Sequence, residues 1–230
     1  MIAGYEHFLR IADRVQWDEA EIDLSADARA WPAAGDERVA ELIAGFCVGE
    51  AGVAEHLAPF AAAASPAAAR CFAAQERDEL RHARFFARAV SEVLGAADPR
   101  ELLSAEFLEL FEVRLPEAAA AASTDLAGAV GLYHMVLEGV VFTAGQYALL
   151  ERLDPRLPGL RQGTDLVLRD ERWHVGFGTR CLIDAGLDEA AILSEGERAA
   201  AVWAPEQAER VVTTLRRRLA MVRSERVTVH

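Results

Sequence analysis

Two short stretches of this sequence are nearly identical and carry side chains that bind metals. Residues 77–82 read RDELRH and residues 169–174 read RDERWH, so each stretch contains Glu-x-x-His. Both lie in segments predicted to be helical, where positions i and i+3 are neighbours on one face. Each copy therefore aims a carboxylate and an imidazole in one direction, and the repeat predicts a metal site.

One further glutamate precedes each copy in apolar surroundings. Glu50, within FCVGEAGV, precedes Glu79 by 29 residues, and Glu138, within YHMVLEGVVF, precedes Glu171 by 33. The two members of each pair lie at similar distances from the chain break between them, roughly 20 Å along an antiparallel helix pair. Four helices that supply four glutamates and two histidines are typical of a dimetal carboxylate bundle. We expect two metal ions to be bound by Glu50, Glu79, His82, Glu138, Glu171 and His174.

The alternative is that Glu-x-x-His recurs by chance on solvated helix faces. A glutamate inside an apolar helix argues against this, because a buried carboxylate without a partner costs several kcal/mol. His134 lies one turn before the third glutamate and could also reach the site. Glu55 and His56 are expected at the surface, and Glu76 and Asp78 are expected to face other neighbours.

Asp170 stands directly before a ligand glutamate and suggests a supporting role. A metal-binding histidine usually donates its second ring N–H to a carboxylate, which orients the ring. We expect Asp170 to meet His82 of the other helix pair. The alternative is an exposed helix charge, as most aspartates are.

The rest of the chain reads as helices joined by short breaks, without alternating strand patterns. We predict an all-α fold with a ferritin-like four-helix bundle core and additional helices, as one domain over residues 1–230. Trp17 to Pro32 is expected to be an extended segment, and residues 194–196 a break. The predicted helices cover residues 3–15, 35–60, 66–94, 101–121, 125–153, 160–185 and 205–222.

Composition narrows the class of protein. The net charge of −13 argues against a nucleic-acid partner, which would need a basic surface. Three widely spaced cysteines fit a reducing cytoplasm, and the N-terminus does not read as a secretory signal. Residues 128–150 are apolar for long enough to span a bilayer. Because Glu138 lies within them, we expect the buried central helix of a bundle and no membrane span.

The ligand pattern resembles the superfamily of the ribonucleotide reductase small subunit (R2). Three flanking segments are similar more specifically to the R2-like ligand-binding oxidases, namely FCVGEAGVAEHLAPF, YHMVLEGVVFTAGQY and RDERWHVGFG. A fourth, VQWDEAEIDLSADARAW, resembles the entry segment of the superfamily. The resemblance covers roughly residues 5–185.

This resemblance implies a manganese–iron or di-iron centre on the six residues given above, with O₂ as co-substrate. It implies an electron path from Trp17 through Asp170 to His82, a fatty-acid-like or other hydrophobic ligand, and a homodimer. It also implies an ether cross-link between Val53 and Tyr133. Otherwise Val53 is ordinary core and Tyr133 a buried aromatic residue with a satisfied hydroxyl.

Departures from the family pattern separate three possible functions. Phe86 stands where ordinary R2 proteins have a radical-bearing tyrosine, and the C-terminal VRSERVTVH has no tyrosine. Gln146 stands where the oxidases have a second tyrosine, and the chain is shorter than typical members. We therefore expect a dimetal oxidase or oxygenase that acts on a hydrophobic ligand. The alternatives are an R2-like radical generator and a ferritin-like iron-binding protein.

Overall fold

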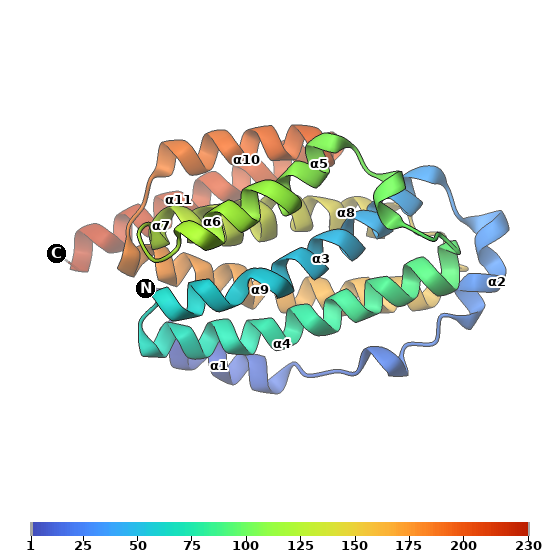
Figure 1. Ribbon diagram of the computed structural model, residues 1–230, viewed down its shortest axis with the longest axis horizontal. Coiled ribbons are helices and arrows are strands. Elements are labelled where there is room, and N and C mark those ends of the chain that lie inside the picture. Colours follow the sequence, from blue (N-terminus) through green and yellow to red (C-terminus); the bar gives the residue numbers. More distant parts are fainter. Residues whose placement is uncertain (1, 230) are drawn as a thin grey trace.

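The computed structural model describes residues 2–229, with side chains up to residue 227, and all regular structure in that part is helical (Figure 1). Two antiparallel helices, α3 (Glu37–Ala63) and α4 (Pro66–Arg88), pack side by side. Beside them lie a composite helix formed by α7 (Leu126–Val130), η5 (Gly131–Phe142) and α8 (Thr143–Arg152), and helix α9 (Pro158–Ala185). The predicted all-α fold with a four-helix core is confirmed.

Further helices cover this core. The N-terminal part comprises α1 (Tyr5–Arg14), which packs on α4 and α9, then the short turn η1 (Glu19–Glu21) and α2 (Ser25–Ala34). Helix α4 continues into the π-turn η2 (Ala89–Leu94). The segments that follow it are η3 (Pro99–Leu102), α5 (Ala105–Glu109), η4 (Leu110–Arg114) and α6 (Leu115–Ala121). Of these, η3, η4 and α6 pack on α3.

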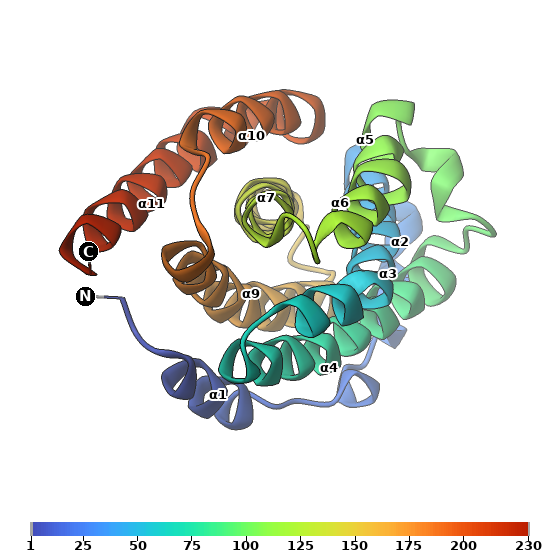
Figure 2. The same ribbon diagram turned by 60° about the vertical axis from the view of Figure 1, so that its left-hand side comes forward.

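The composite helix α7–η5–α8 lies at the centre of the molecule. Figure 2 shows it end-on, with α6, α9, α10 (Glu189–Trp203) and α11 (Ala208–Val229) around it; the turn η6 (Pro205–Gln207) joins the last two. The helix Leu126–Arg152 is long and apolar enough to cross a membrane, but 78% of its most apolar 18-residue stretch is buried inside the protein. A helix that is apolar all round needs such burial. The burial expected for this segment is therefore observed.

Residues Gly131–Phe142 of the central helix are wound as a π-helix. The hydrogen bonds of a π-helix join residues five apart, and such turns are frequent at functional sites. In an α-helix of 3.6 residues per turn, positions five apart point in different directions. The π-winding instead brings Tyr133 and Glu138 onto one face.

Two predictions of chain breaks are wrong. Trp17 to Pro32 is not simply extended, because α2 forms within it; its alanines are strong helix formers, and Pro32, in the last turn, removes one hydrogen bond to the Ala28 carbonyl without ending the helix. Residues 194–196 continue α10 without a break. A Cβ atom on Gly196 would lie 2.5 Å from Leu215, so this glycine allows α10 and α11 to pack closely.

Asp27 anchors helix α9 from outside it. Its fully buried carboxylate accepts hydrogen bonds from the backbone N–H groups of Gly159 (3.0 Å) and Leu160 (2.8 Å). These groups have no partner within a helix that starts at Pro158, and a carboxylate at a helix N-terminus also favours the helix dipole. Helix α2 thus caps the helix that carries the second Glu-x-x-His.

We predict that Asp27→Ala lowers the free energy of unfolding by about 2–3 kcal/mol, because two buried N–H groups lose a charged acceptor. Urea denaturation of the metal-free protein measures this. Asp98→Ala is the matched control, since Asp98 caps the exposed turn η3, and its effect should stay within about 1 kcal/mol. Equal losses in the two variants would contradict the role given to Asp27.

Candidate metal centre

The structure brings the six predicted ligands together in the bundle core. Their ligand atoms form two groups, and within each group the atoms lie within 4.8 Å of one another. All six side chains are buried, and the two groups share the glutamates of the two Glu-x-x-His motifs. The first group is Glu50, Glu79, His82 and Glu171; the second is Glu79, Glu138, Glu171 and His174.

Glu79 and Glu171 face both groups with different oxygens. Nδ1 of His82 lies 3.3 Å from Glu79 Oε2 and 3.4 Å from Glu171 Oε1. Nδ1 of His174 lies 3.1 Å from Glu79 Oε1 and 3.3 Å from Glu171 Oε2. Each of these carboxylates therefore offers one oxygen to each group. Each remaining glutamate lies beside one histidine. Glu50 Oε2 is 3.5 Å from Nδ1 of His82, and Glu138 Oε2 is 3.6 Å from Nδ1 of His174.

The donor atoms themselves show that cations fit here. Both oxygens of Glu50, one oxygen each of Glu79, Glu138 and Glu171, and Nδ1 of His82 are buried without a hydrogen-bond partner. Orphaned carboxylate oxygens are costly in a protein interior. Two divalent cations would balance four carboxylate charges, and carboxylates with imidazoles suit iron and manganese alike. The residues present fit a dimetal centre.

Burial and mutual contact shift the pKa values of these groups in the metal-free protein. Burial raises the pKa values of Glu50 and Glu138 well above the ordinary value of 4.5. Burial opposes ionisation of Glu79 too, but His174 and His82 hold its pKa well below that value. Burial alone would lower the pKa values of His82 and His174, yet the surrounding carboxylates raise both well above 6.5.

Asp170 lies on the far side of His82 from the carboxylates. Its Oδ2 accepts from Trp17 Nε1 at 2.7 Å and lies 3.3 Å from His82 Nε2. Burial acts against its ionisation, but His82 and Trp17 lower the pKa of Asp170 to about 2. Asp170 is fully buried, so the alternative of an exposed helix charge does not hold. The three residues of the suggested path are thus in contact.

A second tryptophan and aspartate mirror this arrangement at the other histidine. Asp78 Oδ2 accepts from Trp173 Nε1 at 3.1 Å and lies 3.5 Å from His174 Nε2. Arg81 joins the two aspartates, donating to Asp78 at 2.7 Å and to Asp170 at 2.9 Å. The expectation that Asp78 faces away from the site is therefore wrong. The Asp common to both RDExxH copies was the signal that could have revealed it.

The remaining candidate residues lie either in the buried core of the bundle or at its surface. Tyr133 is fully buried, and its hydroxyl donates to Glu79 Oε1 at 3.1 Å. Val53 is buried on α3 one turn after Glu50. Glu55 is exposed, as expected. Gln75 was missed by the sequence analysis, although its side-chain amide contacts Glu79, Tyr133 and Glu138.

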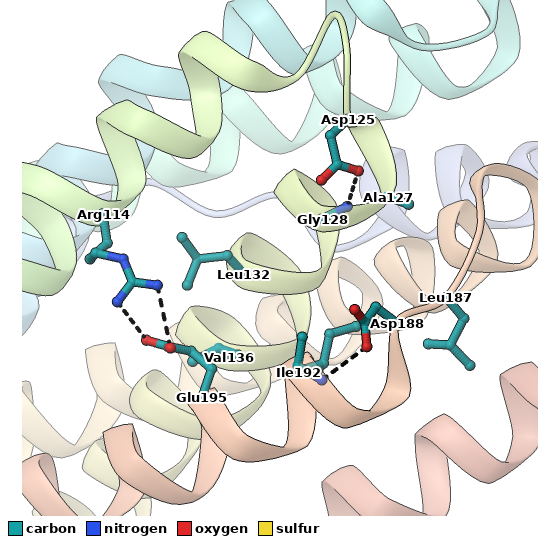
Figure 3. Close-up of a pocket in the computed structure, with 11 residues that line it drawn as sticks. Arg114, Asp125, Ala127, Gly128, Leu132, Val136, Leu187, Asp188, Ile192 and Glu195 are labelled. Atoms are coloured by element: carbon teal, nitrogen blue, oxygen red, sulfur yellow. Dashed lines mark hydrogen bonds and ion pairs between the residues drawn. The ribbon is translucent and has the colours of Figure 1, made fainter.

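A cavity of about 430 Å³ lies outside the carboxylate cluster (Figure 3). Its apolar lining includes Leu132, Val136 and Ile192. Arg114 and Glu195 form an ion pair at 3.3 Å across one side of it. The six candidate ligands are not among the residues that line this cavity.

Comparison with solved structures finds proteins of the same fold. A valine-to-leucine variant of an R2-like ligand-binding oxidase with an anaerobically reconstituted Mn/Fe cofactor matches with a TM-score of 0.76 and 24% identity, over 97% of this chain and 92% of that one. A valine-to-isoleucine variant, also anaerobically reconstituted with Mn/Fe, matches with a TM-score of 0.73 and 23% identity, over 99% of this chain and 85% of that one. A tyrosine-to-phenylalanine variant with an aerobically reconstituted Mn/Fe cofactor matches with a TM-score of 0.73 and 21% identity, over 97% of this chain and 93% of that one.

No protein-family model matches the chain. The structural likeness extends over nearly the whole chain and confirms, at the level of the fold, the resemblance inferred from the sequence. The chain has the fold of the R2-like ligand-binding oxidases.

We predict that Asp78→Asn and Asp170→Asn each weaken metal binding about 10- to 100-fold, because each aspartate orients one histidine of the cluster. Calorimetric titration of the metal-free protein with Fe(II) or Mn(II) measures this. Asp165→Asn, an exposed aspartate on the same helix as Asp170, removes the same charge and should leave affinity unchanged. Wild-type affinity in both buried variants would overturn this role.

Metal affinity should rise with pH, because protons on the raised-pKa groups must leave before metals bind. In the folded metal-free protein these groups bind more protons than in the unfolded chain. Around pH 4.5 the lowered pKa values of Glu79 and Asp170 oppose the raised values of Glu50 and Glu138. The free energy of unfolding should therefore fall as the pH rises above 6.5, where the unfolded chain loses the protons that His82 and His174 retain in the folded protein. Thermal unfolding and calorimetry across this range test both slopes. A pH-independent affinity without proton release would contradict the assignment.

Proposed function

We propose that this chain is a dimetal oxidase or oxygenase of the R2-like ligand-binding oxidase type. The observation that carries the proposal is the pair of overlapping ligand groups that share Glu79 and Glu171. Structures of the same fold carry a Mn/Fe cofactor, which supports a centre of that composition or of two irons. Bound there, two reduced metal ions would supply the activation of O₂ for oxidation of a C–H bond.

The chain's own residues contribute orientation and a dry surrounding. Asp170 and Asp78 each orient one histidine, and Trp17 and Trp173 hold the aspartates. Trp17 is half-buried, so the Trp17–Asp170–His82 chain leads from near the surface to the ligands, as an electron path requires. Trp173 is buried, so the mirrored chain stays inside the protein.

Aromatic side chains exclude water from one end of the cluster. Phe46 lies one turn before Glu50, and Phe86 lies one turn after His82; their rings stack with centroids 4.8 Å apart. Phe142, one turn after Glu138, packs on Phe46 at 5.8 Å. We propose that a hydrophobic, fatty-acid-like ligand meets the metals from this apolar end, with its carboxylate toward the ions.

Phe86 also bears on the reductase alternative. It has no hydroxyl, is fully buried and stacks on Phe46, so this position has no side chain that forms a tyrosyl radical. This observation favours an oxidase over an R2-like radical generator. The resemblance further implies a cytoplasmic homodimer; the free cysteines Cys47, Cys71 and Cys181 are compatible with a reducing compartment, and light scattering tests the dimer.

We also propose the Val53–Tyr133 cross-link. The new bond would join the Tyr133 oxygen to a Val53 side-chain carbon, and the hydroxyl hydrogen and the C–H hydrogen would pass with two electrons to O₂. The contact of the Tyr133 hydroxyl with Glu79 supports this by placing that hydroxyl at the candidate metal centre. Peptide mass spectrometry tests it, since the joined peptides are lighter by two hydrogen atoms than their sum.

We predict that protein reconstituted anaerobically with Fe(II) and Mn(II) binds two metals per chain and consumes O₂ on exposure to air. Glu138→Ala should reduce the rate of O₂ consumption at least tenfold and lower metal occupancy, because it removes a ligand and leaves its neighbours unbalanced. Elemental analysis and an oxygen electrode measure both. Glu55→Ala is the exposed-glutamate control and should behave as wild type. Full metallation and activity of Glu138→Ala would refute the proposed function.

A further inference from the structure

A polar pair that the proposed mechanism does not use lies at the end of the cluster opposite the aromatic layer. Gln75 is one turn before Glu79, and His134 is one turn before Glu138; both are fully buried. Nε2 of Gln75 lies 2.9 Å from Glu79 Oε1, 2.9 Å from the Tyr133 hydroxyl and 3.1 Å from Glu138 Oε1. Its amide thus contacts two candidate ligands and the cross-link tyrosine together.

His134 fixes which way this amide points. Its Nε2 lies 3.0 Å from Gln75 Oε1, and this contact directs the amide NH₂ toward the carboxylates. The reversed amide would set its carbonyl oxygen against Glu79 Oε1, the carboxylate oxygen that also accepts from Tyr133, where a donor is favourable. His134 must then carry its hydrogen on Nε2. Nδ1 of His134 has no hydrogen-bond partner, in keeping with that tautomer.

The surroundings of His134 keep it neutral and in place. Its ring packs between Phe72 (5.6 Å) and Phe177 (5.3 Å), and burial, followed by the nearby His174, lowers its pKa well below 6.5. Helix α9 admits the ring through Gly178, where a Cβ atom would lie 2.1 Å from the Cβ of His134. The pair is therefore held by α4, η5 and α9 together.

The hydrogen atoms at this end of the cluster match the acceptors one to one. Gln75 has two N–H hydrogens and Tyr133 one O–H hydrogen. The three acceptors are the Tyr133 oxygen, Glu138 Oε1 and Glu79 Oε1. If Gln75 donates to the first two, the Tyr133 hydroxyl donates to Glu79 across a distance of 3.1 Å. Every polar group in the set is then satisfied.

We propose that Gln75, oriented by His134, is a positioning residue that aims the Tyr133 hydroxyl at Glu79 and so prepares it for oxidation. The inference rests on the proposed function for its consequence, cross-link formation, but its geometry exists in the metal-free protein. The cross-link would remove the hydroxyl hydrogen, while the ether oxygen would still accept from Gln75. The same amide thus serves Tyr133 before and after the reaction.

The first test uses metal-free protein that contains 3-fluorotyrosine. The chain has three tyrosines, and Tyr133→Phe assigns the ¹⁹F resonance of position 133. Gln75→Met and His134→Leu should both shift this resonance, whereas His134→Gln should restore it, because a glutamine amide can again donate to Gln75. Gln146→Met is the matched control: Gln146 is equally buried, but its amide atoms have no hydrogen-bond partner.

The second test measures cross-linked peptide after aerobic reconstitution. Gln75→Met and His134→Leu should lower the yield about tenfold or more, and His134→Gln should restore most of it. An unshifted Tyr133 resonance with full cross-link yield in Gln75→Met would overturn the inference, as would failure of His134→Gln to differ from His134→Leu. If Gln75→Met does not fold, the comparison of His134→Leu with His134→Gln tests the inference. A wild-type protein that forms no cross-link would refute that part of the proposed function, while the fluorine spectra would still test the positioning role.

Discussion

The burial of four carboxylates and two imidazoles in the centre of an apolar bundle is the constraint on which the rest of this structure depends. Several of these oxygens have no hydrogen-bond partner within the protein. Such groups are tolerated only where opposite charge compensates them. The histidines compensate part of the charge in the metal-free protein, which is why their pKa values are raised. Two divalent ions bound at the two ligand groups would complete the compensation.

The same constraint accounts for the layer of charges outside the histidines. Asp78 and Asp170 are buried aspartates that would be costly alone, and Arg81 bridges them while its guanidinium lies over the Trp17 ring at 5.0 Å. The cluster thus has a charged layer beyond its histidines, an apolar aromatic layer at one end and a polar amide layer at the other. This asymmetry separates the end proposed for the hydrophobic ligand from the end where Tyr133 is held.

The helices of the core could be predicted from the sequence because their apolar periodicity and breaks are strong. The helix predicted for residues 66–94 is observed as α4 and η2, between the cap at Ser65 and Gly95, which has a φ of 65°. Helix α2 was not predicted although its alanines favour a helix, whereas the continuity of α10 depends on packing. Asp27 contacts a helix more than a hundred residues away, and Gly196 reports the approach of α11 rather than a break.

The sequence by itself determined which six residues are candidate ligands. The i, i+3 spacing within a twice-repeated motif and the two glutamates in apolar helices require a shared buried site, because isolated buried carboxylates are too costly. Only the tertiary structure decided which carboxylates face both groups, that Asp78 mirrors Asp170, and that Gln75 reaches Tyr133. These facts depend on the register between helices distant in sequence and on the π-winding of Gly131–Phe142, which no local spacing reveals.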